Sequence, residues 1–208
     1  FNLCKKLGIK NVALSFANKA EDIAELRAIV GKNIRIIAKI ESRFALENLD
    51  EILDVSDAIL IDRGDLSREI ALESLPYIQK EIIQRANNCN VPVYVATNLL
   101  ETMIENLKPN RSEVNDVVNT LQDGADGLVL AAETAIGKHP VSAVRMIKSL
   151  IYRYQNQIEI FSEENFLPHT NLIEPHGGKL VQNIIFDKTV LDIASLPKLE
   201  IDEQSMID

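Results

Sequence analysis

The chain has 208 residues, of which 46% are hydrophobic and 25% are charged, a composition typical of a globular protein with a sizeable core. Its formal net charge of -9 disfavours nucleic acids and anionic membranes as partners, because their phosphate groups would repel it. Cys4 and Cys89 lack metal-ligand spacing, and no apolar run is long enough to span a bilayer. We therefore expect a cytoplasmic protein. The first segment has helical character and starts at Phe1, so we expect that an upstream portion is missing.

Five short apolar runs predict β-strands. They are residues 12–16, 34–40, 58–61, 91–96 and 127–130. Each run is continuously apolar, without a polar residue at every second position, which is typical of parallel strands covered on both faces.

Amphipathic segments between these runs predict helices. Asn18 is expected to cap a helix that closes at Gly31, and Ser112 to cap one that ends at Gly124. Pro140 suits the first turn of a further helix. Five consecutive strand–helix units indicate an α/β fold with a parallel sheet and right-handed crossovers. Composition alone leaves open whether that sheet is open or closed.

The sequence changes character after about residue 160. Residues 161–172 are mostly polar, contain Pro168 and are expected to form a linker. A single strand-like run follows at 179–186. We therefore predict a first domain at 1–160 and the start of a second at 173–208.

Polar residues gather where the strand runs end. They are Lys39, Glu41, Asp65, Thr97, Glu133 and Thr134. The carboxyl ends of parallel barrel strands meet at one mouth, so these side chains should converge there. A lysine with carboxylates and a hydroxyl suits magnesium-assisted chemistry on a small anion. Glu133 and Thr134 could instead organise the last loop or the nucleotide side of the site.

Six segments together resemble the pyruvate kinase family over residues 1 to about 155. They are ALSFANKA at 13–20, IRIIAKIES at 34–42, DAILIDRGDLSREI at 57–70, VATNLLETM at 95–103, PNRSEVNDV at 109–117 and DGADGLVLAAETA at 123–135. The resemblance implies the last five strand–helix units of a (β/α)8 TIM barrel. It also implies phosphoryl transfer from phosphoenolpyruvate to ADP, which gives pyruvate and ATP in glycolysis.

The resemblance implies a role for each matching residue. Lys39 would contact the transferring phosphoryl group and stabilise the enolate, and Glu41 and Asp65 would ligate Mg²⁺ or Mn²⁺. The backbone amides of Gly64 and Asp65 would hold the substrate carboxylate. Thr97 would assist proton delivery to the enolate carbon. Phosphoryl transfer depends mainly on positioning and charge stabilisation, which such a small set can supply.

The resemblance also implies K⁺, whose ligands would lie outside this fragment, and a homo-oligomer for the full protein. Only five of eight barrel strands are expected here, and exposed parallel edges promote aggregation. We therefore expect the isolated fragment neither to fold stably nor to turn over substrate.

Some positions depart from the family pattern. They are Phe44, Asp62, Ser67, Arg68, Asn98, Ala131 and Ala132. Asp62 replaces a small alanine, and a carboxylate facing phosphoenolpyruvate would repel it or take the metal unless it were protonated or turned away. We hypothesise that Asp62 weakens or alters catalysis, so that Asp62→Ala should increase turnover or substrate affinity.

The tail resembles a different family. Residues 174–181, EPHGGKLV, and 196–201, LPKLEI, are similar to the N-terminus of ATP sulfurylase (sulfate adenylyltransferase). A gene fusion would explain this resemblance, and a chance Gly-Gly turn before a strand is the alternative.

Four functions remain open from the sequence. The first is a pyruvate kinase-type transferase, and the second is a bifunctional fusion with a sulfate-activating domain. The third is a non-catalytic binding or regulatory barrel, which Asp62 favours and the retained Glu41 and Asp65 disfavour. The fourth is a pyruvate-binding aldolase or lyase, which the arrangement of Lys39, Glu41 and Thr97 disfavours.

Overall fold

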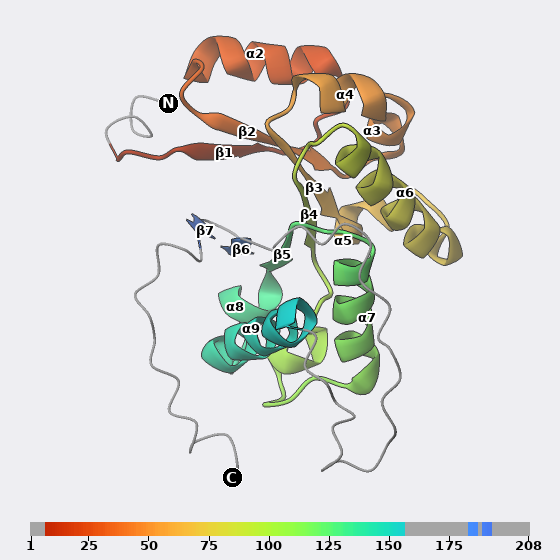
Figure 1. Ribbon diagram of the computed structural model, residues 1–208, viewed down its shortest axis with the longest axis vertical. Coiled ribbons are helices and arrows are strands. Elements are labelled where there is room, and N and C mark those ends of the chain that lie inside the picture. Colours follow the sequence, from red (N-terminus) through yellow and green to blue (C-terminus); the bar gives the residue numbers. More distant parts are fainter. Residues whose placement is uncertain (1–6, 157–182, 187–188, 193–208) are drawn as a thin grey trace.

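The computed structural model describes residues 7–156 and the two strands at 183–186 and 189–192 (Figure 1). The strands are β1 (Asn11–Leu14), β2 (Arg35–Ile40), β3 (Ala58–Asp62), β4 (Val93–Ala96), β5 (Gly127–Leu130), β6 (Asn183–Phe186) and β7 (Thr189–Asp192). The longer helices are α2 (Ala20–Val30), α4 (Leu49–Val55), α6 (Leu75–Asn88), α7 (Arg111–Gln122) and α9 (Pro140–Asn156). The short helical turns are α3 (Arg43–Glu47), α5 (Arg63–Leu66), η1 (Leu72–Ser74), η2 (Glu101–Ile104) and α8 (Ala132–Ala135).

The strands form one sheet in chain order, from β1 to β7. Strands β1 to β6 run parallel to one another, and β7 pairs with β6 in the antiparallel sense. Figure 1 shows the sheet curving, with helices α2, α4, α6 and α7 following one another along it. Five parallel strands with intervening helices confirm the predicted α/β class and partial barrel.

The alternation of side chains along each strand separates two apolar clusters. The larger cluster lies between the sheet and the helices and includes Ile36, Ile59 and Val95. The smaller cluster lies on the opposite face, which we call the inner face. It consists of Ile37, Ala58, Leu60, Tyr94, Ala96 and Val129. Lys39 and Asp62 follow at the same two-residue spacing as this inner set, so they belong to the inner face.

The first helix cap differs from the prediction. Helix α2 begins after Lys19 and not after Asn18. The carboxylate of Asp22 accepts hydrogen bonds from the backbone N–H groups of Asn18 and Lys19, at 2.9 and 3.1 Å. Asp22, the third residue of the helix, therefore binds the backbone N–H of the N-cap residue and of the residue before it, as the acidic member of a capping box does. Gly31, at φ 82°, ends the helix as predicted.

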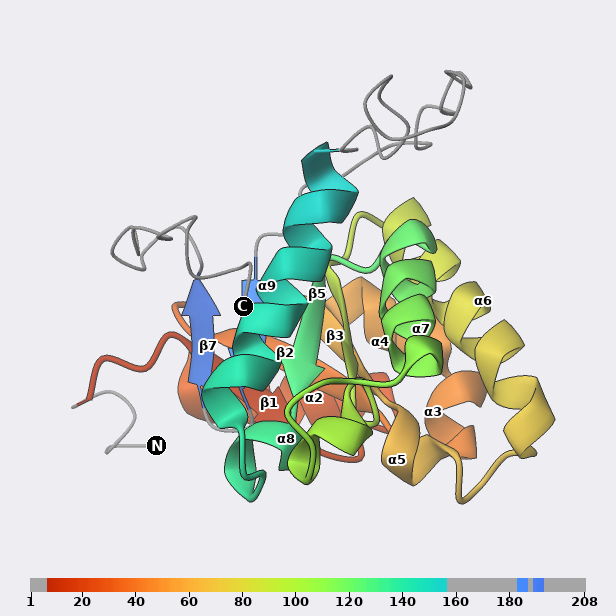
Figure 2. The same ribbon diagram turned by 90° about the horizontal axis from the view of Figure 1, so that it is seen from below.

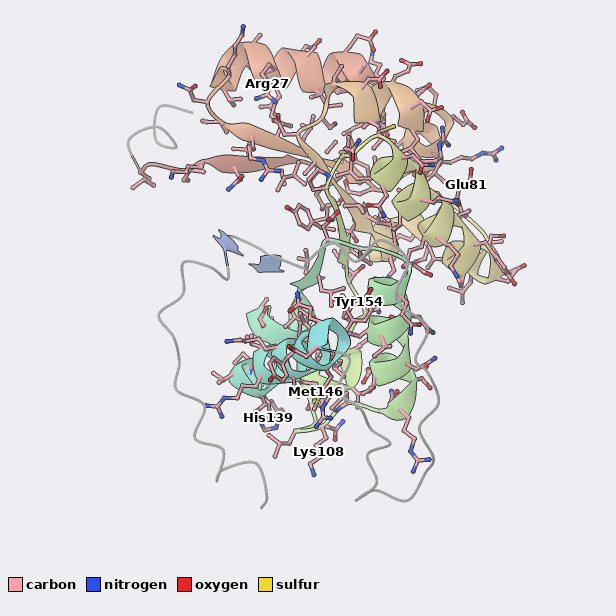
Figure 3. All side chains as sticks on the ribbon, viewed as in Figure 1. Arg27, Glu81, Lys108, His139, Met146 and Tyr154 are labelled. Atoms are coloured by element: carbon pink, nitrogen blue, oxygen red, sulfur yellow. The ribbon has the colours of Figure 1, made fainter. Side chains whose placement is uncertain are left out.

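The cap of α7 lies earlier than predicted, whereas that of α2 lies one residue later. Asn110, and not Ser112, caps this helix in a reciprocal capping box with Glu113, both hydrogen bonds measuring 2.9 Å. Gly124 follows the helix at φ 101°, and α9 begins at Pro140 as predicted. Figure 3 shows Met146 and Tyr154 on α9, which packs beside α7.

Asp57 connects three elements just before β3. It pairs with Arg27 of α2 and accepts a 2.7 Å hydrogen bond from the backbone N–H of Ile36 in β2; Figure 3 labels Arg27 on α2. Burial alone would raise the pKa of Asp57, but these two contacts and the charge of Arg35 lower it overall. These three residues therefore stabilise the ionised form of Asp57.

Strand β6 confirms part of the strand predicted at 179–186. The linker predicted at 161–172 lies outside the described residues, and the division at about residue 160 stays a prediction. Within the described part of the chain, none of the helices combines the length and apolar character needed to cross a bilayer.

Candidate active site

The carboxyl ends of β2, β3 and β4 lie at the same end of the sheet, because the strands are parallel and in register. Figure 2 shows α5 and α8 at the end toward which β5 points. Lys39 lies near the end of β2, Asp62 is the last residue of β3, and Thr97 follows β4. The predicted convergence of strand-end residues is therefore present.

Lys39 lies between two carboxylates. Its Nζ pairs with Glu41, and it is 3.1 Å from Oδ2 of Asp62. Burial alone would lower the pKa of Lys39, but the hydrogen bonds and charges of the two carboxylates raise it overall. Glu41 is only 1% exposed, and its second oxygen accepts a 2.6 Å hydrogen bond from the backbone N–H of Phe16. This bond ties the end of β1 to the ion pair.

Three carboxylates form a compact donor set. Oxygens of Glu41, Asp62 and Asp65 lie within 4.8 Å of one another. Carboxylate oxygens are hard ligands of the kind that Mg²⁺ and Mn²⁺ prefer, so the set fits a divalent cation. The sequence left open that Asp62 is turned away from the site; in the structure its carboxylate faces the other two. It extends the pair that the resemblance implied to a group of three.

Thr97 joins the carboxylates to the start of α5. Its Oγ1 accepts a 2.8 Å hydrogen bond from the backbone N–H of Gly64. The same hydroxyl lies 3.2 Å from Oδ1 of Asp62 and 2.6 Å from the carbonyl of Ala96, either of which can accept its single proton. A Cβ on Gly64 would lie 3.4 Å from both Thr97 Oγ1 and Asp62 Oδ1. Both distances are ordinary van der Waals contacts, so these two side chains leave room for a Cβ here.

The backbone is unusual at Thr97 and Asn98, with φ values of 67° and 54°. A β-branched residue rarely adopts positive φ, because its side chain crowds the backbone. Arg63 holds this turn: its guanidinium donates to the carbonyl of Thr97 at 2.7 and 3.1 Å and to that of Asn98 at 3.0 Å. It also pairs with Asp116 of α7 at 2.8 Å. Arg63 is 8% exposed, and the sequence analysis assigned it no role.

Glu133 and Thr134 make hydrogen bonds in the last loop, and Glu133 also bonds the segment after β4. Glu133 is 2% exposed and accepts hydrogen bonds from the backbone N–H groups of Leu100 and Ala131, at 3.0 and 2.9 Å. The hydroxyl of Thr134 donates to the carbonyl of Ala131 at 3.2 Å. These contacts agree with the loop-organising alternative.

Other departures from the family pattern engage local partners. The Ser67 hydroxyl donates to the carbonyl of Gly64 at 2.8 Å, and the Asn98 side chain donates to Glu101 at 2.7 Å. Phe44 is 56% exposed. Among all the positions that depart from the family pattern, Asp62 is the one whose own carboxylate belongs to the group of three.

Comparison with known proteins identifies the class. The family described as "Pyruvate kinase, barrel domain" matches residues 1–144, which is more than half of the chain. The chain therefore belongs to the pyruvate kinase family.

Individual relatives agree with this assignment. The chain is 47% identical to pyruvate kinase of Thermotoga maritima over 152 residues, which is 72% of this chain and 33% of that protein. It is 43% identical to pyruvate kinase of Mycobacterium tuberculosis strain H37Rv over 148 residues, or 70% and 31% of the two chains. It is 36% identical to pyruvate kinase of Geobacillus stearothermophilus over 196 residues, or 91% and 33%.

The chain thus spans about a third of the length of these relatives. The match to the Geobacillus protein covers 91% of this chain, so it extends into the segment 173–208. These comparisons do not support the predicted ATP sulfurylase resemblance of that segment.

Proposed function

We propose that this chain carries part of the active site of a pyruvate kinase-type phosphotransferase, which moves a phosphoryl group from phosphoenolpyruvate to ADP. One observation carries the proposal. A lysine ammonium, three carboxylates and a threonine hydroxyl meet at one mouth of a parallel sheet. Family membership supports the same reading.

In this proposal Glu41 and Asp65 hold a divalent cation, Mg²⁺ or Mn²⁺. The ion would supply positive charge that neutralises substrate oxygens during transfer. Glu41 is fixed for this task by the backbone N–H of Phe16. Asp65 is less constrained, with a side chain that is 34% exposed and lies 3.3 Å from Arg68. The K⁺ that the family resemblance implies would take ligands from elsewhere.

Lys39 would stabilise negative charge on the transferring group and on the enolate. An ordinary lysine is already protonated through the neutral range, and the two carboxylates raise the pKa of Lys39 and so favour the same charged form. A fixed cation in a partly buried site stabilises developing negative charge better than a solvated one. The inner-face position of Lys39, beside the carboxylates, suits this role.

Gly64 and Thr97 would act on the other end of the substrate. The backbone N–H groups of Gly64 and Asp65 are proposed to bind the substrate carboxylate. The Gly64 N–H already donates to the Thr97 hydroxyl, so the substrate carboxylate would take over an acceptor position that Thr97 now fills. The released hydroxyl of Thr97 would then lie beside the substrate, where it could help deliver a proton to the enolate carbon.

The test is phosphoenolpyruvate-dependent ATP synthesis by the complete gene product with Mg²⁺ and K⁺. Lys39→Met should lower kcat by about a hundred- to a thousand-fold, as loss of a major charge-stabilising group does. Lys32→Met is a matched control, because Lys32 is exposed in the loop before β2, at the opposite end of that strand. Wild-type protein that binds phosphoenolpyruvate but makes no ATP would point to a regulatory barrel. Condensation of pyruvate with an aldehyde would point to a lyase.

A fusion with sulfate adenylyltransferase stays a prediction, based on residues 174–181 and 196–201. These residues lie outside the described part of the chain. The coding sequence downstream tests the idea, because a sulfurylase would need its nucleotide-binding motifs there. The homo-oligomer is likewise a proposal, and light scattering of the complete gene product would test it.

A further inference from the structure

Asp62 is the departure from the family pattern that enters the carboxylate group. It ends β3 on the inner face and is 8% exposed. One oxygen lies 3.1 Å from the Lys39 ammonium, and the other lies 3.2 Å from the Thr97 hydroxyl. The side chain therefore contacts both residues to which the proposed function gives catalytic roles.

The position of Asp62 changes the charge of the site. Glu41, Asp62 and Asp65 bring three negative charges together, and Lys39 compensates one of them. Without Asp62, two carboxylates and one ammonium would leave a single negative charge. A divalent cation would bring the summed charge of Lys39 and the three carboxylates to zero, whereas without Asp62 the same sum would be one positive charge. Arg68 lies 3.3 Å from Asp65 but is 80% exposed, so solvent screens most of its charge.

The extra negative charge of Asp62 should raise the affinity for the divalent cation and lower the affinity for the anionic substrate. A third carboxylate oxygen adds both a ligand and a charge for the cation, and the number of ligand charges strongly tunes cation affinity. The substrate is an anion, so loss of the remaining positive charge weakens its electrostatic attraction. Burial of Glu41 and Asp62 keeps solvent from screening these effects.

We propose that Asp62 is a third carboxylate ligand, which lets this protein bind its divalent cation tightly before the substrate arrives and lowers its affinity for phosphoenolpyruvate. The inference rests on the proposed function, because it concerns the same metal and substrate. It differs from a purely structural role, in which Asp62 would only orient Lys39 and Thr97. A purely structural role gives Asp62 no direct part in cation affinity.

Asp62→Asn separates these roles. Asparagine keeps a similar shape and a carbonyl oxygen that can accept the Thr97 hydrogen bond, but it removes the charge. Asp62→Glu restores the charge and serves as a second variant. Asp54→Asn is the matched control, because Asp54 is an exposed carboxylate of α4 outside this group.

The experiment measures Mn²⁺ binding to the complete gene product without substrate, by the electron paramagnetic resonance signal of free Mn²⁺. Phosphoenolpyruvate binding is then titrated at saturating Mn²⁺. We expect Asp62→Asn to weaken Mn²⁺ binding at least about ten-fold and to tighten phosphoenolpyruvate binding. Asp62→Glu should stay closer to wild type in Mn²⁺ affinity, and Asp54→Asn should match wild type in both titrations.

Unchanged or tighter Mn²⁺ binding by a folded Asp62→Asn protein overturns the proposal. If Mn²⁺ binding falls and phosphoenolpyruvate binding does not tighten, the substrate half of the proposal is wrong. Thermal unfolding without metal shows whether each variant is folded. Failure of the proposed function is recognised separately, as wild-type protein that binds Mn²⁺ but makes no ATP from phosphoenolpyruvate and ADP.

Discussion

Replacement of Arg63 by methionine should destabilise the protein and displace Thr97. Arg63 is buried, and its guanidinium donates three hydrogen bonds to the carbonyls of Thr97 and Asn98. Both of those residues have positive φ, a backbone conformation that costs about 1–3 kcal/mol per residue. Contacts with the surrounding structure stabilise this turn, and the hydrogen bonds from Arg63 are the main ones.

The contacts of Arg63 set the size of the effect. Methionine fills much of the same volume but leaves two carbonyls without their donor, at about 1–3 kcal/mol each. The ion pair with Asp116 adds no more than about 1 kcal/mol, because the Asp116 side chain is 39% exposed. We therefore expect a loss of about 2–7 kcal/mol in the free energy of unfolding. Thr97 would also lose its position beside Asp62, so kcat should fall more than KM rises.

Urea denaturation followed by circular dichroism, on the complete gene product, measures this loss. Arg63→Lys should recover only part of it, because an ammonium lacks the planar fork that reaches both carbonyls. Asp116→Asn is the control for the ion pair alone and should cost no more than about 1 kcal/mol. A loss below about 1 kcal/mol for Arg63→Met would refute the argument that Arg63 holds the turn.

Three further predictions follow from single contacts. The lowered pKa of Asp57 means that its stabilising contribution is present above its unfolded-state pKa of about 3.9 and is lost as the pH falls through the lower folded value. Asp57→Asn should therefore flatten the dependence of the urea midpoint on pH in that acidic window, and an unchanged slope would contradict this. Glu133→Ala should lower the free energy of unfolding by about 2–6 kcal/mol in the same assay, because it leaves two backbone N–H groups without their acceptor, at about 1–3 kcal/mol each. A loss below about 1 kcal/mol would show that water replaces the carboxylate. Gly137→Ala should cost more than about 1 kcal/mol, because the added Cβ would lie 2.3 Å from the backbone oxygen of Glu133; an unshifted thermal midpoint would contradict that clash.

The sheet was predictable because each of its first five strands is a continuous apolar run. All five predicted strands of residues 1–156 are present, and Gly127–Leu130 has the predicted bounds. Strand β4 begins at Val93 and not at Val91. The N–H of Val91 closes the end of α6 by donating to the carbonyl of Ala86. Hydrophobicity cannot reveal which partner a backbone group takes, so strand ends were less accurate than strand identities.

The convergence of Lys39, Glu41, Gly64, Asp65 and Thr97 was predictable for a different reason. Parallel strands place their carboxyl ends at one edge, so chain order and strand position are enough. The helix caps were less predictable. Asn110 and Ser112 are equally suitable capping residues for α7, whereas α2 has Lys19 at its N-cap position and Asp22 binds the N–H groups there. Local composition offers several candidates within two positions, and backbone geometry selects among them.

The role of Arg63 could not be read from the sequence. An arginine in a turn before glycine is usually a solvated charge, and its partners lie far along the chain, in the turn after β4 and in α7. Its burial depends on how these segments meet, which is a property of the folded chain. A buried arginine with several carbonyl partners is recognisable only once the structure is known.

Residues of β2 alternate between the helix-facing side and the inner face of the sheet, and this alternation determines which mutations the strand can tolerate. Within Arg35–Ile40, residues 36, 38 and 40 face the helices, while Ile37 and Lys39 face inward. Deletion of one residue before Lys39 would shift the strand by one position, turning the ammonium toward the helices and an isoleucine toward the carboxylates. Point substitutions at apolar positions of this strand should therefore be far better tolerated than any single-residue insertion or deletion. Gene variants in this region should accordingly differ in residue type while keeping the same strand length.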